Sequence, residues 1–154
     1  MSSAGFIGKN TTSLDAKGRC SFPRDLRKSL PESSAKTVVI TIGSDRSLSL
    51  YPIEEWKKFM EELSHRPRKP ENVRFRRQIM GMAKESTLDG QNRVSLTEEQ
   101  RKYAGIEGEV TFAGDGAIVG LWNPDRYQTL YELSDDKALS EFDALFYWDD
   151  EESK

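Results

Sequence analysis

An internal repeat organises this chain of 154 residues. Residues 13–22 (SLDAKGRCSF) resemble residues 87–96 (TLDGQNRVSL) at an offset of 74, and residues 50–56 resemble residues 121–127 at an offset of 71. The second copy is therefore three residues shorter in one internal connection. Copies of about 50–60 residues are small for independent folding, so we expect the two to pack together into one unit.

Each copy predicts the same order of elements: a strand, an Asp-x-x-x-Arg turn, a second strand, a short helix, a hairpin and a longer amphipathic helix. In the first copy, the β-branched run 37–42 enters a turn at 43–46, and residues 47–51 return. In the second copy, the corresponding hairpin turns at 114–116. The pattern predicts a mixed α+β fold.

The predicted helices have amphipathic faces and start signals. In the first copy, five apolar residues share one helical face: Ile53, Trp56, Phe59, Met60 and Leu63. The counterpart in the second copy starts at 123–125, where a proline follows Asn123. Thr97 and Gln100 have the spacing of a capping box at the start of a short helix.

We expect four segments along the chain: a first repeat at 5–63, a basic linker and helix at 64–84, a second repeat at 85–134, and an acidic helix and tail at 135–154. Two prolines interrupt the linker, so it cannot be helical throughout.

A helix beginning near Val73 would place four apolar residues on one face: Phe75, Ile79, Met82 and Ala83. Three arginines occupy the rest of its circumference: Arg74, Arg76 and Arg77. They form either a solvated face or a surface for acidic groups across a subunit interface or for phosphates.

Charge is divided unevenly along the chain. The formal net charge is −3, but residues 132–154 hold nine acidic residues and two lysines, a net of −7, which leaves +4 for residues 1–131. A basic body with an acidic tail favours a polyanion-binding surface whose tail limits nonspecific contacts. Solubility alone would explain the same pattern equally well.

Several classes of function are disfavoured. No apolar run is long enough for a membrane span, and no secretory signal is visible. Cys20 is the only cysteine and His65 the only histidine, which excludes an intrachain disulfide and a thiolate-rich zinc site and favours a reducing cytosol. No nucleophile and base are paired by spacing, so we expect no enzyme, metal, cofactor or small-molecule substrate. Cys20 alternates with Phe22 and should point into the interior.

The paired Asp-x-x-x-Arg turns are the candidate site. An aspartate at the first position of a tight turn accepts hydrogen bonds from backbone N–H groups further along it, and this is the expected role of Asp15 and Asp89. Gly18 can adopt a positive φ, and asparagine, present as Asn92 in the second copy, tolerates it best among the other residues.

A turn fixed in this way would hold the bases of Lys17 and Arg19 in place and lower the entropy cost of binding. In the other interpretation, each arginine pairs with its own aspartate as a structural clip.

The runs 14–19 (LDAKGR) and 88–93 (LDGQNR), with Pro23 and residues 50–52 (LYP), resemble the MraZ family of bacterial transcriptional regulators over about residues 5–134. The resemblance implies a double swapped-hairpin β-barrel of the AbrB/SpoVT type, formed by the two repeats of one chain and flanked by short helices. It also implies a ring-like homo-oligomer that is cytoplasmic and associated with the nucleoid. Its partner would be double-stranded DNA, and its target would be the division and cell-wall gene cluster.

Carried over by position, the resemblance assigns DNA contact to Lys17, Arg19 and Arg93, and turn shape to Asp15, Gly18, Asp89 and Asn92. The second loop departs from the family pattern in two ways, because Asn92 replaces a glycine and Gln91 carries no charge where the first loop has Lys17. Identical loops on a ring that meets tandem DNA repeats about one helical turn (~10 bp) apart would gain affinity through effective concentration.

The alternative function is a protein-binding or antitoxin-like module on the same barrel. The C-terminal segment offers apolar anchors on one helical face, with two aromatics just beyond it: Ala138, Phe142, Leu145 and Phe146, then Tyr147 and Trp148. This helix packs on its own subunit, on a neighbour in the ring, or on a foreign partner. A DNA reader should lose affinity steeply with salt, whereas a protein-binding surface should depend on apolar anchors.

Overall fold

The structure, a computed structural model, describes residues 4–147. The chain divides into two compact units, the first ending at Pro124 and the second beginning at Asp125. Both repeated Asp-x-x-x-Arg turns lie in the first unit.

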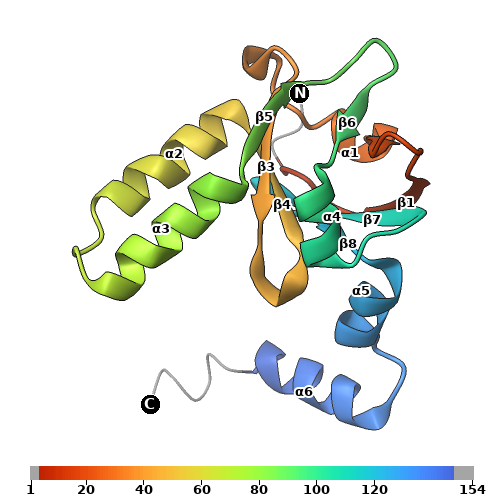
Figure 1. Ribbon diagram of the computed structural model, residues 1–154. Coiled ribbons are helices and arrows are strands. Elements are labelled where there is room, and N and C mark those ends of the chain that lie inside the picture. The colour runs from red at the N-terminus through yellow and green to blue at the C-terminus, as the bar shows by residue number, and fades with distance from the viewer. Residues whose placement is uncertain (1–3, 148–154) are drawn as a thin grey trace. The chain divides into compact units, whose positions relative to one another are not determined.

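A six-stranded antiparallel sheet forms the centre of the first unit (Figure 1). Its strands, in spatial order, are β1 (Lys9–Ser13), β7 (Glu109–Asp115), β8 (Ile118–Trp122), β4 (Leu48–Pro52), β3 (Thr37–Ile42) and β5 (Lys84–Thr87). Both predicted hairpins are present: β3 pairs with β4, and β7 pairs with β8.

The two repeats exchange their first strands. Strand β1 of the first repeat pairs with β7 of the second, with Thr11 opposite Thr111. Strand β5 of the second repeat pairs with β3 of the first, with Thr37 opposite Thr87. Because β4 also pairs with β8, neither copy has a sheet of its own.

A second, two-stranded sheet pairs β2 (Arg19–Ser21) with β6 (Arg93–Ser95), with Cys20 opposite Val94. The chain leaves the larger sheet at each Asp-x-x-x-Arg turn, and an isolated bridge between Leu14 and Cys20 links the two sheets. Strands β1 and β5 are therefore the outer strands of an open sheet. No closed barrel is found among residues 4–147, and the predicted swapped-hairpin barrel is not confirmed, whereas the α+β class is.

The core draws apolar side chains from both copies. Phe22 of the first repeat stacks on Phe112 of the second, with ring centroids 5.6 Å apart. The fully buried apolar side chains include Phe22, Phe112, Leu26, Ile40, Leu48, Leu50, Ile106, Leu121, Val38, Val94 and Val110. Because burial of apolar surface is the main favourable term in folding, this shared core makes the repeats depend on each other.

Two longer helices, α2 (Ile53–Ser64) and α3 (Pro70–Met82), both contact β3. On α2, Leu63 is buried and the rest of the predicted face is half-buried. Helix α3 begins at Pro70, earlier than predicted, because proline suits the first helical position. On its predicted apolar face Ile79 is buried, but Phe75 is 36% exposed.

Helix α4 (Glu98–Ala104) is fastened to the first repeat and to the end of α3 by a buried glutamine. Thr97 and Gln100 form the predicted capping box, with both bonds at 3.0 Å. The Gln100 Nε2 atom also donates to the carbonyl oxygens of Ile40 and Met82, each at 2.9 Å. The remaining short elements of this unit are α1 (Arg24–Arg27) and two 3₁₀ turns, η1 (Glu32–Ser34) and η2 (Ser44–Arg46).

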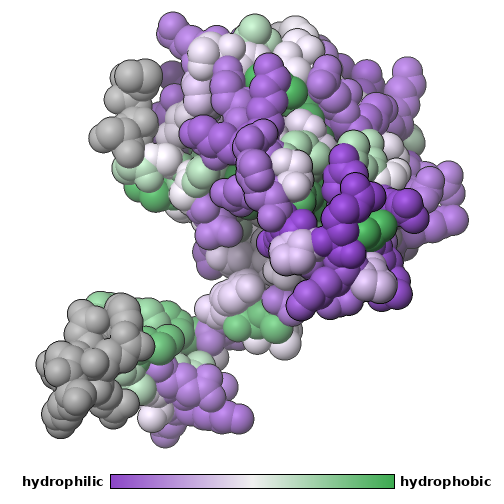
Figure 2. Space-filling view, turned by 90° about the vertical axis from the view of Figure 1, so that its left-hand side faces the viewer, coloured by the Kyte–Doolittle hydropathy of each residue, from purple (hydrophilic) through white to green (hydrophobic). Residues whose placement is uncertain are grey.

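The second unit contains most of α5 (Pro124–Tyr131) and all of α6 (Asp136–Phe146). The Asp135 carboxylate caps α6 by accepting a 2.7 Å bond from the Ala138 N–H. Apolar side chains gather on the surface of this unit (Figure 2), and those exposed include Leu139, Phe142, Leu145, Phe146 and Tyr147. Trp148 and the acidic run 149–152 of the predicted tail lie outside the described residues. Within residues 4–147, no helix is long and apolar enough to span a membrane.

Candidate nucleic-acid interface

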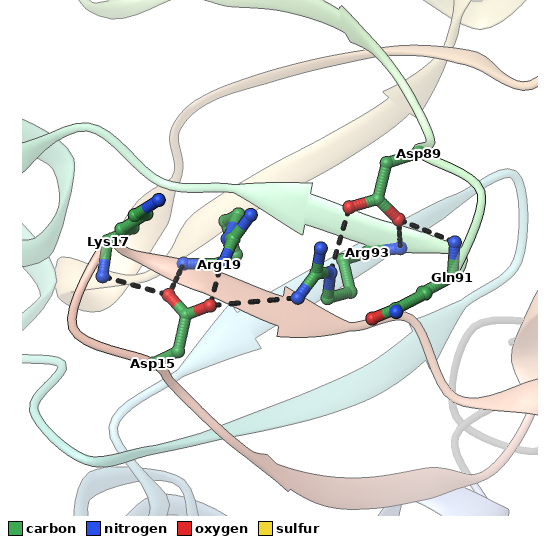
Figure 3. A network of polar contacts seen from close by, with 6 residues as sticks. All are labelled: Asp15, Lys17, Arg19, Asp89, Gln91 and Arg93. Atoms are coloured by element: carbon green, nitrogen blue, oxygen red, sulfur yellow. Dashed lines mark hydrogen bonds and ion pairs between the residues drawn. The ribbon is translucent and has the colours of Figure 1, made fainter.

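The first turn is built around the carboxylate of Asp15 (Figure 3). Its Oδ1 accepts hydrogen bonds from the backbone N–H of Lys17 at 2.9 Å and of Arg19 at 2.8 Å. Its Oδ2 accepts a 2.8 Å bond from the Arg19 Nε. Gly18 completes the turn at φ +79°, a left-handed conformation that glycine adopts without steric cost.

The second turn repeats this geometry with Asp89. Oδ1 accepts from the N–H of Gln91 at 2.9 Å and of Arg93 at 3.0 Å, and Oδ2 accepts from the Arg93 Nε at 2.8 Å. Asn92 occupies the left-handed position at φ +58°. In both turns the pKa of the aspartate is lowered, first by the backbone N–H of the arginine and then, against an opposing effect of burial, by its guanidinium.

Pairing of β2 with β6 sets the two turns side by side (Figure 3). Arg93 Nη1 lies 3.9 Å from Asp15 Oδ2, so the first carboxylate faces an arginine from each repeat. The arginine side chains are 32% exposed at Arg19 and 24% exposed at Arg93.

The structural clip that the sequence left open is therefore present in both turns. Each clip occupies the Nε atom of its arginine. The terminal nitrogens of Arg19 have no partner among residues 4–147 and reach solvent. Lys17 is exposed, and its side chain points away from Asp15. The structure thus brings Lys17, Arg19 and Arg93 together, and their contact with DNA stays a prediction.

Comparison with known proteins identifies the family. The family model described as "MraZ protein, putative antitoxin-like" matches residues 6–77 and 79–151, one stretch over each repeat. The chain belongs to the MraZ family. Its relatives include a protein named transcriptional regulator MraZ from Lachnoclostridium phytofermentans, which is 33% identical over 92% of this chain and 99% of the relative.

Two further relatives carry the same name. The protein from Thioalkalivibrio sulfidiphilus is 37% identical over 79% of this chain and 82% of its own length. The protein from Halorhodospira halophila is 36% identical over 80% of this chain and 82% of its own length.

In this MraZ-family chain, each turn is also held by the opposite repeat. The Phe22 N–H donates to the Asn92 carbonyl at 3.0 Å, and the Leu96 N–H donates to the Gly18 carbonyl at 2.8 Å. A Cβ atom on Gly18 would lie 2.7 Å from the Leu96 carbonyl oxygen, so only glycine fits at this position. The turns are therefore fixed from two sides, by their own aspartate and by the other repeat.

Sequence reasoning missed two arginines beside the turns. Arg101 of α4 lies against Gly18, and Arg27 of α1 lines a depression of about 550 Å³ together with Asn92. The signal that could have found them is their spacing, because Arg27 and Arg101 are separated by the same 74 residues as the two turns.

Cys20 is 1% exposed, and burial raises the pKa of its thiol to about 12. Burial disfavours the thiolate, so this sulfur is a poor nucleophile near neutral pH. Among residues 4–147, no group of three or more His, Cys, Asp or Glu side chains could hold a metal ion.

Proposed function

We propose that this chain is a sequence-specific DNA-binding transcriptional regulator, and not an enzyme, that acts in the cytoplasm at the nucleoid. Its ligand would be tandem promoter repeats upstream of the division and cell-wall gene cluster, bound through the two Asp-x-x-x-Arg loops. The observation that carries the proposal is the pair of turns that β2 and β6 set side by side with their cations toward solvent. The names of the relatives support the regulatory role.

The clip suits this function because it orients the guanidinium without consuming it. The Nε of Arg19 is fixed on Asp15, and its terminal nitrogens remain for a guanine edge or a phosphate. Lys17 acts as a point charge on the DNA backbone. Because the clip already restricts the Arg19 side chain in the free protein, that side chain loses less conformational entropy when DNA binds.

A single pair of turns gives a weak electrostatic site. The two turns hold three cations, Lys17, Arg19 and Arg93, and two carboxylates, Asp15 and Asp89, so their net charge is +1. Nonspecific electrostatic binding to DNA has a Kd near ~10⁻⁴ to 10⁻⁶ M. We therefore propose that the chain assembles into a ring-like homo-oligomer whose several turns meet repeats about one helical turn (~10 bp) apart.

The test is binding to tandem-repeat DNA taken from the chain's own upstream region, measured by mobility shift and fluorescence anisotropy over a series of salt concentrations. Arg19→Ala should abolish specific binding, Arg93→Ala should weaken it, and both should leave the oligomer mass unchanged. Lys58→Ala on α2 is the matched control, since it removes one exposed cation from another surface. Wild-type affinity and salt slope in Arg19→Ala would overturn the loop assignment.

The second candidate function is a protein-binding or antitoxin-like module. The exposed apolar side chains of α6 favour it, as does the antitoxin-like description of the family. Deletion of residues 135–154 followed by light scattering separates the roles of this helix. A smaller oligomer would assign α6 to the ring, whereas unchanged mass with intact DNA binding would leave its apolar face for a foreign partner.

A further inference from the structure

Arg101 of the second repeat reaches across to the turn of the first. A Cβ atom on Gly18 would lie 3.2 Å from the Nε of Arg101 and 3.3 Å from its Cζ, so the guanidinium packs on the bare backbone of that glycine. The Nε is buried and has no hydrogen-bond partner, and no ion pair forms at this side chain within residues 4–147. The side chain as a whole is only half-buried, and its terminal nitrogens make no hydrogen bond to any residue in the described range 4–147.

The equivalent arginine of the first repeat is engaged differently. Arg27 lies 74 residues before Arg101 and lines the depression beside Asn92, the counterpart of Gly18. Its Nη1 donates a 2.8 Å hydrogen bond to the Phe22 carbonyl. The arrangement is thus crossed, with each short helix supplying an arginine to the turn of the other repeat. Within the described part of the chain, Arg27 has a hydrogen-bond partner and Arg101 has none.

The difference between Arg101 and Arg27 changes how positive charge is divided between the two turns. The two clips leave the turns with a net charge of +1, which is low for a surface that binds a polyanion, and Arg27 and Arg101 raise it to +3. The first turn then combines Lys17, Arg19 and Arg101, whereas the second combines the uncharged Gln91, Arg93 and the engaged Arg27. The positive charge is therefore concentrated at the first turn.

We propose that Arg101 is a DNA-contacting residue that completes a three-cation phosphate site with Lys17 and Arg19, and that the first turn is therefore the stronger half of the interface. This inference rests on the proposed DNA-binding function. The phosphate would accept hydrogen bonds from the terminal nitrogens of Arg101, and the packing on Gly18 would hold the guanidinium in place.

The experiment compares Arg101→Gln, Arg27→Gln and Lys102→Gln on the same tandem-repeat DNA over a series of salt concentrations. Lys102 is the matched control, because it lies next to Arg101 on α4, carries the same charge, and pairs with Glu98 at 3.4 Å. We expect Arg101→Gln to weaken binding about tenfold and to lower the salt slope by about 1. Arg27→Gln should weaken binding less than threefold, and Lys102→Gln less than twofold.

Each outcome decides the proposal. Arg101→Lys keeps the charge and should retain the wild-type salt slope. If Arg101→Gln is unstable, this variant shows whether binding depends on the charge or on the packing of the side chain. Wild-type binding by Arg101→Gln, or an equal loss of affinity in Lys102→Gln, would overturn the inference. The proposed DNA-binding function would not fall with it, because that function is tested separately by Arg19→Ala. If the wild-type chain did not bind the tandem-repeat DNA, the proposed function would be wrong, and this inference with it.

Discussion

Arg93 of the second turn places its Nη1 atom 3.9 Å from Oδ2 of Asp15 in the first turn. That oxygen already accepts the hydrogen bond from Arg19 Nε, so one carboxylate is shared between the two repeats. Residues that share a partner show interaction energies rather than independent effects. The two turns therefore form one electrostatic unit, and substitutions in them should not be additive.

Removal of the shared carboxylate should loosen sequence discrimination. In Asp15→Asn, the side-chain oxygen still accepts backbone N–H bonds, but no carboxylate orients Arg19 and one negative charge is lost. We expect tighter binding to scrambled DNA, with a smaller ratio between specific and scrambled sequences, because the cation becomes stronger and less directed. Anisotropy titrations on both DNAs measure that ratio.

Asp45→Asn is the control for this change, since it removes the same charge in the β3–β4 turn, where asparagine tolerates the φ of +54°. A ratio that stays constant in Asp15→Asn would show that the clip does not direct Arg19.

The same alanine substitution should have unequal costs in the two turns. Gly18→Ala adds the strain of a positive φ and a contact of 2.7 Å with the Leu96 carbonyl, so the free energy of unfolding should fall by about 3 kcal/mol. Asn92→Ala replaces a residue that already has a side chain at φ +58° and should cost about 1 kcal/mol. Urea denaturation of both variants makes the comparison, and equal costs would contradict it.

Gln100→Ala should be among the most destabilising single changes. It removes the side-chain half of the capping box and leaves the carbonyl groups of Ile40 and Met82 without their donor. A loss of about 3 kcal/mol in the free energy of unfolding is expected. Gln78→Ala, at an exposed position of α3, is the control and should change stability by less than about 0.5 kcal/mol.

Cys20 should resist alkylation in the native protein. With the pKa of its thiol raised to about 12, almost no thiolate is present at pH 8, and the sulfur is buried. Iodoacetamide should label it only after unfolding in urea. Because the unfolded thiol ionises near ~8.5, its contribution to stability is complete below that pH and is lost as the pH rises toward 12. Fast labelling of the native chain would show that the β2–β6 sheet opens.

Local features of the fold could be predicted from the sequence because they depend on neighbouring residues. The β-branched run 37–42 and the turn at 114–116 became hairpins, and Thr97 with Gln100 became a capping box. The start of α3 was wrong by three residues, since the basic composition of the linker concealed proline's preference for the first helical turn.

Contacts between the repeats were beyond the reach of local patterns. Pairing of β1 with β7 joins segments about 100 residues apart, and periodicity carries no information about which edge a strand will join. The same holds for Arg101, whose position beside Gly18 follows from the way in which α4 is fastened to β3 through Gln100. The sheet is open because the chain leaves it after β1 and after β5 to form the separate β2–β6 sheet. Composition does not predict where a chain leaves a sheet.

The exchange of first strands also has an evolutionary consequence. In a symmetric dimer of two identical half-length chains, one gene would encode both turns, so every substitution would appear in both. Here a single polypeptide holds both halves and neither half can leave, so the positions of Lys17 and Gln91 are free to diverge while the framework stays paired. Because both repeats belong to one chain, its first turn can carry a lysine where its second carries an uncharged glutamine, without any change to the strands that the repeats exchange.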